Sequence, residues 1–251
     1  MKRAVLFATL SAVTAGCPYV PPETRHPHVN VTEPITKTRY WCYVPSYYSE
    51  DRDWPLVVTL HGTNPWDGRT RQILEWKDTA EQRGLIVVAP QLASTQGPVP
   101  VIPSVWYAKE SDLRHDECMI LAVIDHVVRT HRIDEESILL TGFSSGGFPL
   151  YYVGLRNPER FDMLIARDCN STLSLFERIK LTEEAKKLPI AVFWGKDDLP
   201  AIQEQSWDAF RYLREHGCEN TTRKQTHGGH LRRPDIAWQI WSQRLPRKHL
   251  R

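Results

Sequence analysis

Short apolar segments that alternate with helical segments constrain the fold of this chain more than any other feature. Five apolar segments are nearly continuous, as strands buried on both faces require; they cover residues 56–60, 85–89, 138–141, 163–166 and 190–194. Helices are predicted between and after them, over residues 70–83, 112–131, 145–156, 200–215 and 234–245. This alternation predicts an α/β fold, with a mostly parallel sheet flanked by helices on both faces. Such a sheet places its site at the carboxyl ends of the strands.

One folded domain is expected over residues 37–251. Residues 38–45 alternate and carry aromatic side chains, which is typical of an edge strand that Pro45 closes. Residues 17–36 are rich in proline and polar residues and have no sustained helical or strand period. We therefore expect a tether over residues 17–36, ahead of the folded domain.

The first 16 residues resemble a signal peptide, because two basic residues precede an apolar stretch too short to span a bilayer. Residues 14–17, Thr-Ala-Gly-Cys, resemble the lipobox of bacterial lipoproteins, in which Cys17 would carry the lipid. Cleavage after Ala15 is the alternative and would release a protein without a lipid. The chain is accordingly expected to be exported, either as a lipoprotein anchored in the cell envelope or as a secreted protein.

Composition excludes one class of partner and leaves the state of the cysteines open. Charged residues make up 25% of the chain and the net charge is +2, whereas nucleic-acid-binding surfaces are markedly basic. Nucleic acid is therefore not an expected partner. Four cysteines follow Cys17 and could form disulfides or remain buried thiols; they are Cys42, Cys118, Cys169 and Cys218. None of them has the spacing of a structural zinc site.

The segment 142–147, Gly-Phe-Ser-Ser-Gly-Gly, stands where a predicted strand turns into a predicted helix. It has the pattern Gly-x-Ser-x-Gly with Ser144 at the centre. A turn this tight strains the central residue and exposes its hydroxyl, and the flanking glycines avoid collisions with strand and helix. The first N–H groups of the helix, beginning at Ser145, would face an oxyanion formed at a carbonyl that Ser144 attacks. The segment predicts a nucleophile with part of an oxyanion hole.

A serine hydroxyl becomes a good nucleophile when a histidine takes its proton and a carboxylate holds that histidine. On α/β-hydrolase sheets these groups follow in the order serine, acid, histidine. Asp197 and Asp198 come directly after the strand predicted at 190–194, and His227-Gly-Gly-His230 follows the next predicted strand, within 219–226. The order matches that of a catalytic triad.

With these segments, the chain resembles the serine esterases of the α/β-hydrolase superfamily that include polyhydroxybutyrate depolymerases, feruloyl and acetylxylan esterases and dienelactone-hydrolase-like proteins. The resemblance extends from about residue 38 to residue 245 and rests on residues 55–63, 133–147, 195–198 and 227–230. It implies that Asp198 is the acid and His230 the base, and that the backbone N–H groups of Thr63 and Ser145 form the oxyanion hole. It implies no metal and no organic cofactor.

Other assignments of the same residues remain open at this point. Asp197 could be the acid while Asp198 caps the following helix, and Asp168, after the strand at 163–166, is a further candidate. His227 could replace His230 as the base. His227, His230 and His61 could also bind a metal, but no carboxylate stands at ligand spacing. Otherwise His61 is expected to pack beneath the loop that carries Thr63.

Three aromatic residues are candidates for contact with substrate. Trp66 follows the loop that carries Thr63, called the oxyanion loop below. Trp106 and Tyr107 lie in a long connection between a strand end and a helix. They could stack on a sugar or an aromatic acyl group, or be buried as large hydrophobic residues. The segment 168–188, where many lipases insert a lid, is of moderate length, so we expect an open cleft.

Together these features predict an exported serine carboxylesterase that acts on small or polymeric esters through a Ser-His-Asp triad and an acyl-enzyme. A serine peptidase on the same fold is one alternative. The other is a non-catalytic surface binding protein that keeps the hydrolase scaffold. Labelling by a fluorophosphonate separates an active serine from a binding module.

Overall fold

The computed structural model describes residues 28–96 and 108–250. The predicted signal peptide, Cys17 and the first part of the predicted tether lie outside the described residues, and so do Trp106 and Tyr107.

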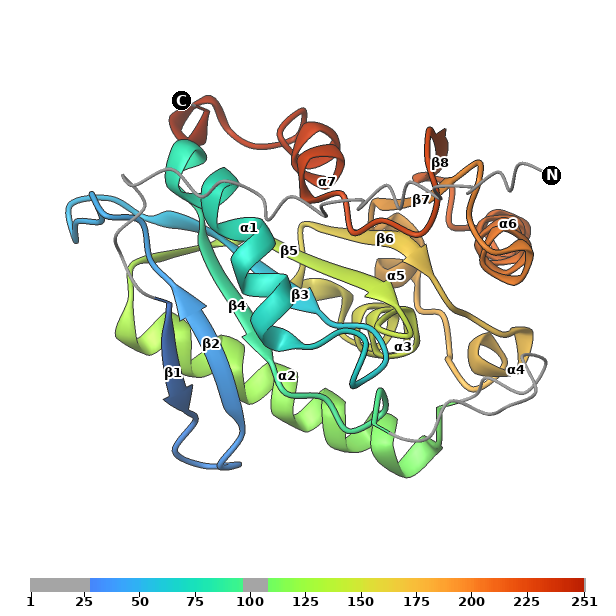
Figure 1. The fold of residues 1–251 in the computed structure, drawn as a ribbon, viewed down its shortest axis with the longest axis horizontal. Coiled ribbons are helices and arrows are strands. Elements are labelled where there is room, and N and C mark those ends of the chain that lie inside the picture. Colours follow the sequence, from blue (N-terminus) through green and yellow to red (C-terminus); the bar gives the residue numbers. More distant parts are fainter. Residues whose placement is uncertain (1–27, 97–107, 251) are drawn as a thin grey trace, which may run out of the picture.

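Within residues 28–96 and 108–250, eight strands form one sheet in the order β1-β2-β4-β3-β5-β6-β7-β8 (Figure 1). The strands are β1 (Val29–Thr32), β2 (Arg39–Tyr43), β3 (Trp54–Leu60), β4 (Ile86–Pro90), β5 (Ile133–Ser144), β6 (Met163–Cys169), β7 (Ile190–Gly195) and β8 (Thr221–Thr226). From β4 to β8 all neighbouring strands pair in parallel, and only β1 and β2 are antiparallel. The mostly parallel sheet predicted from the alternating segments is therefore confirmed.

Two predictions about the amino-terminal part need correction. Residues Val29–Thr32 fall in the predicted tether, yet they form β1, which pairs with β2 from Val29 opposite Cys42 to Thr32 opposite Arg39. Because β1 takes the outer position, β2 is not the edge strand that its sequence indicates. β1 has only four residues and is largely exposed, so its sequence lacks the apolar signal of a buried strand.

Among the described residues, seven α-helices connect and cover the strands: α1 (Arg69–Arg83), α2 (Glu110–Thr130), α3 (Gly147–Arg156), α4 (Leu173–Phe176), α5 (Glu183–Lys187), α6 (Pro200–Glu215) and α7 (Pro234–Trp241). Five of them match the predicted helices. The short helices α4 and α5 were not predicted, because one turn of helix has no apolar period; Thr172 and Thr182 cap them by accepting hydrogen bonds from the backbone N–H three residues on.

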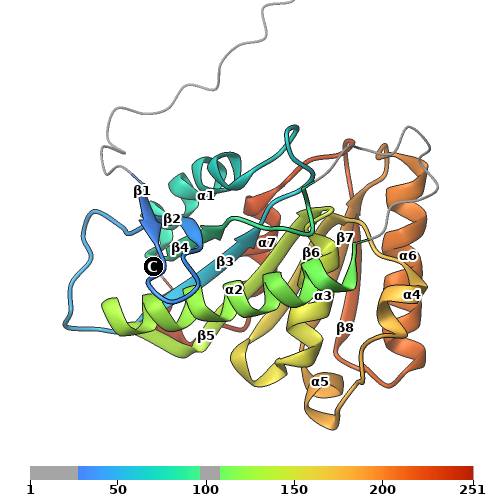
Figure 2. The ribbon, with the colours of Figure 1, turned by 90° about the horizontal axis from the view of Figure 1, so that it is seen from below.

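The helices cover both faces of the sheet (Figures 1 and 2). A separate apolar core lies on each side of it. Ile73 and Trp76 of α1 and Trp241 of α7 pack on one face, together with Val57 and Phe193. Helices α2, α3 and α6 pack on the other face. Burial on both sides is the reason why the central strands have nearly continuous apolar sequences.

Two further features of the described residues bear on the sequence predictions. Cys42, Cys118, Cys169 and Cys218 are all free, so the open question of disulfides is answered here in favour of thiols. None of the helices in the described part combines the length and the apolar character needed to cross a bilayer.

Candidate active site

Ser144 is the last residue of β5 and lies on the turn that leads into α3. Its φ of 53° is in the left-handed region, which a residue with a side chain adopts only under strain. Gly146 allows the turn to close, since a Cβ atom there would come within 2.7 Å of Leu60 O and 2.8 Å of His61 O. The Gly-x-Ser-x-Gly sequence thus forms the tight strand-to-helix turn that it predicts.

Asp198 and His230 lie against each other, although 31 residues separate them in the sequence. His230 Nδ1 donates a hydrogen bond to Asp198 Oδ2 over 3.0 Å, and the side chain of Asp198 is fully buried while that of His230 is 29% exposed. The backbone N–H of Leu199 donates to the other carboxylate oxygen, Oδ1, over 2.6 Å. Both oxygens of Asp198 are therefore held, and one of them orients the imidazole.

The two alternative residues next to this pair point elsewhere. Asp197 is exposed, and its backbone N–H donates to Gly228 O over 3.0 Å. His227 is exposed as well, and its carbonyl accepts a hydrogen bond from Arg233. The geometry thus pairs Asp198 with His230, and it leaves Asp197 and His227 at the surface.

The loops after β7 and β8 touch through their backbones, which brings the acid and the histidine together. A Cβ atom at Gly195 would lie 2.3 Å from Gly228 O and 2.4 Å from Gly229 O, so only glycine fits there. Nearby, the N–H of Lys196 donates to Thr226 O over 2.8 Å. The close approach of these two loops is therefore the reason for glycine at position 195.

His230 and the oxyanion loop both border the turn that carries Ser144. The His230 ring packs on the ring of Phe143, the residue before Ser144, with 4.6 Å between centroids. On another side, a Cβ atom at Gly62 would lie 3.0 Å from Ser144 Cβ. Ser144, His230 and the loop after β3 thus meet at the carboxyl ends of β3, β5 and β8.

Thr63 and Ser145, the residues whose N–H groups were predicted as oxyanion donors, are direct neighbours. Thr63 Oγ1 donates to Ser145 Oγ over 3.0 Å. Ser145 lies just before α3, at the end of the helix where free N–H groups and the helix dipole favour negative charge. The hydroxyl contact fixes the two backbone segments relative to each other.

His61 is buried beneath the oxyanion loop, as expected. Its Nδ1 contacts Gly62 O at 2.8 Å, and its Nε2 accepts from Leu92 N over 3.3 Å, which assigns the proton to Nδ1. Burial lowers the pKa of His61, so the ring is neutral and acts as a brace for the loop. In the described part of the chain, the one cluster with metal-ligand distances does not include His61 or His227.

Asp67 and Arg232 are site residues that sequence reasoning missed. Asp67 Oδ2 accepts from the N–H of Gly62 over 2.7 Å, and Asp67 Oδ1 accepts from Arg232 Nε over 3.1 Å. Arg232 also binds Glu75 Oε1 over 2.7 Å. Burial would raise the pKa of Asp67, but the Gly62 N–H and the charge of Arg232 outweigh it and lower that pKa. This ion pair joins the oxyanion loop to the loop that carries His230.

No local pattern distinguishes Asp67 and Arg232 from ordinary surface charges, because the two partners of the ion pair are 165 positions apart in the sequence. A weak signal exists only in their positions, since each follows a predicted site residue by a few residues.

Asp168 lies beside the acid and the histidine, at the end of β6. Its carboxylate, that of Asp198 and a ring nitrogen of His230 each offer one atom within 4.8 Å of the others. Burial and the negative charge of Asp198 raise the pKa of Asp168 to about 8. For Asp198, burial raises the pKa, but the hydrogen bond from His230 and the neighbouring Asp168 carboxyl group outweigh this and lower it. The two carboxyl groups therefore shift each other's pKa in opposite directions.

Of the three aromatic candidates, only Trp66 belongs to the described residues. Its side chain is 60% exposed, on the loop between the oxyanion residues and α1. It is therefore not a buried core residue. Trp106 and Tyr107 lie outside the described residues, so their predicted contact with substrate stays a prediction.

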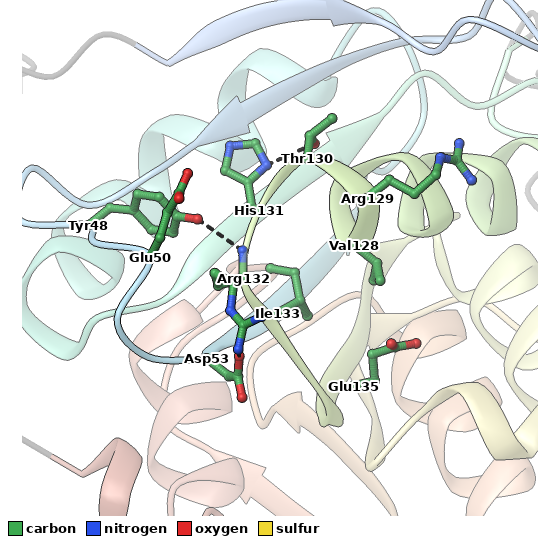
Figure 3. A pocket seen from close by; sticks show the side chains of 10 residues that line it. All are labelled: Tyr48, Glu50, Asp53, Val128, Arg129, Thr130, His131, Arg132, Ile133 and Glu135. Carbon is green, nitrogen blue, oxygen red and sulfur yellow. Dashed lines mark hydrogen bonds and ion pairs between the residues drawn. The ribbon is translucent and has the colours of Figure 1, made fainter.

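A separate cavity of about 380 Å³ lies at the opposite end of the sheet (Figure 3). It is lined by residues of the β2–β3 connection, the end of α2 and the start of β5, among them Tyr48 and Arg132. Arg132 forms an ion pair with Asp53, and its backbone N–H donates to Tyr48 Oη. Since the amino ends of β3 and β5 border this cavity, it is distinct from the site around Ser144.

Comparisons with known proteins identify the family and the fold. The model of the Esterase family, described as "Putative esterase", matches residues 33–251. No protein with curated function matches the sequence at a significant level. Among solved structures, a thermostable esterase is 25% identical with a TM-score of 0.57; the match covers 80% of this chain and 54% of the other, so this chain spans about half the length of that protein.

Two other solved structures have nearly the same length and show the shared fold. Esterase PE8 is 20% identical with a TM-score of 0.62, over 83% of this chain and 97% of the other. A ferulic acid esterase is 16% identical with a TM-score of 0.62, over 88% of this chain and 96% of the other. The family match spans strands β2 to β8 and the loops that follow β3, β5, β7 and β8. The chain therefore belongs to the Esterase family and is a carboxylic ester hydrolase with the α/β-hydrolase fold.

Proposed function

We propose that this esterase works through a triad of Ser144, His230 and Asp198. Ser144 Oγ attacks the ester carbonyl while His230 takes the hydroxyl proton, and the imidazolium then gives that proton to the departing alcohol. The N–H groups of Thr63 and Ser145 hold the oxyanion of each tetrahedral intermediate. Water, activated by His230 in turn, attacks the acyl-enzyme and releases the acid.

The hydrogen bond between Asp198 and His230, next to the strained turn of Ser144, is the observation that carries this proposal. A carboxylate is an acceptor only, so the proton of the neutral imidazole sits on Nδ1. Nε2 is then unprotonated and is the atom that can accept a proton from a hydroxyl. The buried carboxylate also stabilises the imidazolium that forms during the reaction.

Labelling with a fluorophosphonate probe tests the nucleophile and the base together. We expect wild-type protein to be modified at Ser144, as found by mass spectrometry of the labelled peptide. His230→Ala should slow labelling by about 10²-fold or more, because the hydroxyl loses its base.

The matched control is His227→Ala, three residues away and exposed. It should label at the wild-type rate. A fast-labelling His230→Ala protein, or a wild-type protein that is not labelled at all, would contradict the proposal, and the second result would favour a binding module.

For substrate, we propose small or polymeric esters that reach an open cleft beside Trp66. The ferulic acid esterase with the same fold makes an aromatic acyl group one candidate, and the exposed indole of Trp66 is suited to stacking on a sugar or an aromatic ring. Hydrolysis of p-nitrophenyl acetate, methyl ferulate, acetylated xylan and short polyhydroxyalkanoates ranks these classes.

We also propose that the enzyme is exported as a lipoprotein. Support comes from the sequence of residues 1–17, with its basic start, apolar stretch and Thr-Ala-Gly-Cys ending. When the full chain is expressed in a bacterium fed with labelled palmitate, label should enter the protein and disappear in Cys17→Ser. Equal labelling of both proteins, or none in either, would contradict the lipid anchor; a processed, unlabelled protein in the medium would indicate plain secretion.

A further inference from the structure

Asp168 has an unusual position in the sheet. Phe143 of β5 pairs with Arg167 of β6, but the next residue, Ser144, pairs with Cys169, so Asp168 is an extra residue in a bulge. Its φ of 49° lies in the left-handed region. Strain of this kind persists only when the surrounding structure imposes it, and it is concentrated at functional sites.

If the Asp168 carboxyl group is an anion, one of its two oxygens has no hydrogen-bond donor. Oδ1 accepts from the N–H of Gly195 over 2.7 Å. Oδ2 is buried and has no hydrogen-bond partner among the described residues. The residue is fully buried, so bulk water does not solvate that oxygen. A buried charged oxygen without a donor is costly.

The negative charge of Asp198 raises the pKa of Asp168, and this effect is larger than the opposite effect of the positive charge of Arg167. Asp198 approaches from the loop after β7 and His230 from the loop after β8. Its neighbours on β6 are Arg167 and the buried thiol of Cys169. The Arg167 guanidinium forms its hydrogen bonds on other groups, namely Thr141 Oγ1, Thr59 Oγ1, Gln72 Oε1 and Arg232 O.

We propose that Asp168 is a positioning residue that keeps its proton in the working enzyme and donates a hydrogen bond from Oδ2 to the carboxylate of Asp198. A proton on Oδ2 gives this oxygen a hydrogen-bond partner, the carboxylate of Asp198. It also makes Asp168 neutral and so removes the repulsion between two buried carboxylates. This inference rests on the proposed triad, in which Asp198 is the charged acid.

The proposed hydrogen bond has two consequences for the reaction. It adds a third donor to Asp198, beside Leu199 N and His230 Nδ1, and so holds the carboxylate in line with the imidazole. It also leaves one negative charge beside His230 in place of two. Apolar, buried surroundings can keep a carboxylic acid neutral near pH 7 for use as a donor, and the pKa of Asp168, raised to about 8 by burial and by Asp198, agrees with this.

Two substitutions test whether Asp168 acts as a neutral hydrogen-bond donor or as a negative charge. Asp168→Asn is neutral at every pH and can offer its amide N–H in place of the carboxyl O–H, so kcat/KM at pH 7 should stay within about threefold of wild type. Asp168→Leu keeps the bulk but has no donor, and kcat should fall by about 10- to 100-fold with KM nearly unchanged. Infrared difference spectra should show a protonated carboxyl band in wild type that Asp168→Asn lacks.

The pH profile provides a readout that a merely structural role would not change. As pH rises through about 8, Asp168 ionises and repels Asp198, so wild-type kcat/KM should fall on the alkaline side. Asp168→Asn should keep its activity there. The thermal stability of the wild-type protein should also fall with pH. A carboxyl group whose pKa is raised in the folded state lowers the free energy of unfolding as pH rises from about 4 to about 8. Asp168→Asn has no such group at this position and should not show that decrease.

The outcomes distinguish this inference from the proposed function. If Asp168→Asn loses activity as severely as Asp198→Asn, Asp168 works as an anion and the inference is wrong while the triad stands. If Asp168→Leu is fully active, the hydrogen bond has no positioning role. If Asp198→Asn itself is fully active, the proposed triad fails first. Stabilisation of wild type by added Zn²⁺, lost in Asp168→Asn, would mean that a cation and not a proton neutralises the pair.

Discussion

Replacing Ser144 by alanine should lower kcat for p-nitrophenyl acetate by at least about 10⁴-fold, because the atom that forms the acyl-enzyme is removed. The residue occupies a surface turn and not the apolar core, so the fold should be retained. Activity assays with far-ultraviolet circular dichroism and thermal unfolding check both parts. A Ser144→Ala protein that hydrolyses the ester at the wild-type rate, after mass spectrometry has excluded contamination, would remove the nucleophile from the mechanism.

The backbone of Ser144 supplies a matched control. Its φ of 53° costs about 1–2 kcal/mol for a residue with a Cβ atom, and glycine avoids that cost. Glycine loses about 0.5–1 kcal/mol more in chain entropy on folding. Ser144→Gly should therefore be as inactive as Ser144→Ala but more stable by about 0.5–1 kcal/mol in its free energy of unfolding. A Ser144→Gly protein that is less stable than Ser144→Ala by about 0.5–1 kcal/mol, the chain-entropy cost of glycine alone, would show that the turn is not strained.

Asp198→Asn should have the second largest effect, a loss of about 10³- to 10⁴-fold in kcat. The asparagine side chain keeps the size of the residue, but it removes the negative charge that stabilises the imidazolium and no longer fixes the proton on Nδ1 of His230. KM should change little, since the residue is buried behind the histidine and away from the substrate. Steady-state kinetics at several pH values measure the two constants separately.

Asp197→Asn is the control that the chain itself offers. It removes the same charge one position earlier, from an exposed side chain whose backbone alone contacts the histidine loop. We expect kcat within about twofold of wild type, since an exposed charge is well screened. If Asp197→Asn were the damaging substitution and Asp198→Asn were mild, the roles of the two residues would have to be exchanged.

The large elements of the fold could be predicted because each carries its own signal. The central strands are buried on both faces, so a continuous apolar sequence identifies them. The helix α6, with Pro200 in its first turn, and α3, which ends before Pro158, have recognisable ends. β1 and the short helices α4 and α5 lack such signals, because β1 is short and largely exposed and a single turn of helix has no apolar period.

In the site, local sequence identified the candidates but could not rank them. Asp197 and Asp198 are adjacent and chemically identical, and His227 and His230 stand three residues apart. Resemblance to a family favoured Asp198 and His230, and the folded loops place this pair in contact while the other two residues are exposed. Which aspartate faces the histidine depends on where the two loops cross, and a single chain segment does not contain that information.

By itself the sequence determined the alternation of strands and helices, the glycines that let the backbone turn at Ser144, and the order of serine, acid and histidine. These are local properties, since periodicity and backbone freedom depend on residues a few positions apart. Only the tertiary structure decided that Arg232 binds Asp67 and that Asp168 lies against Asp198. Such contacts join parallel strands and their loops across long separations, and burial there changes the charge that each carboxyl group can carry.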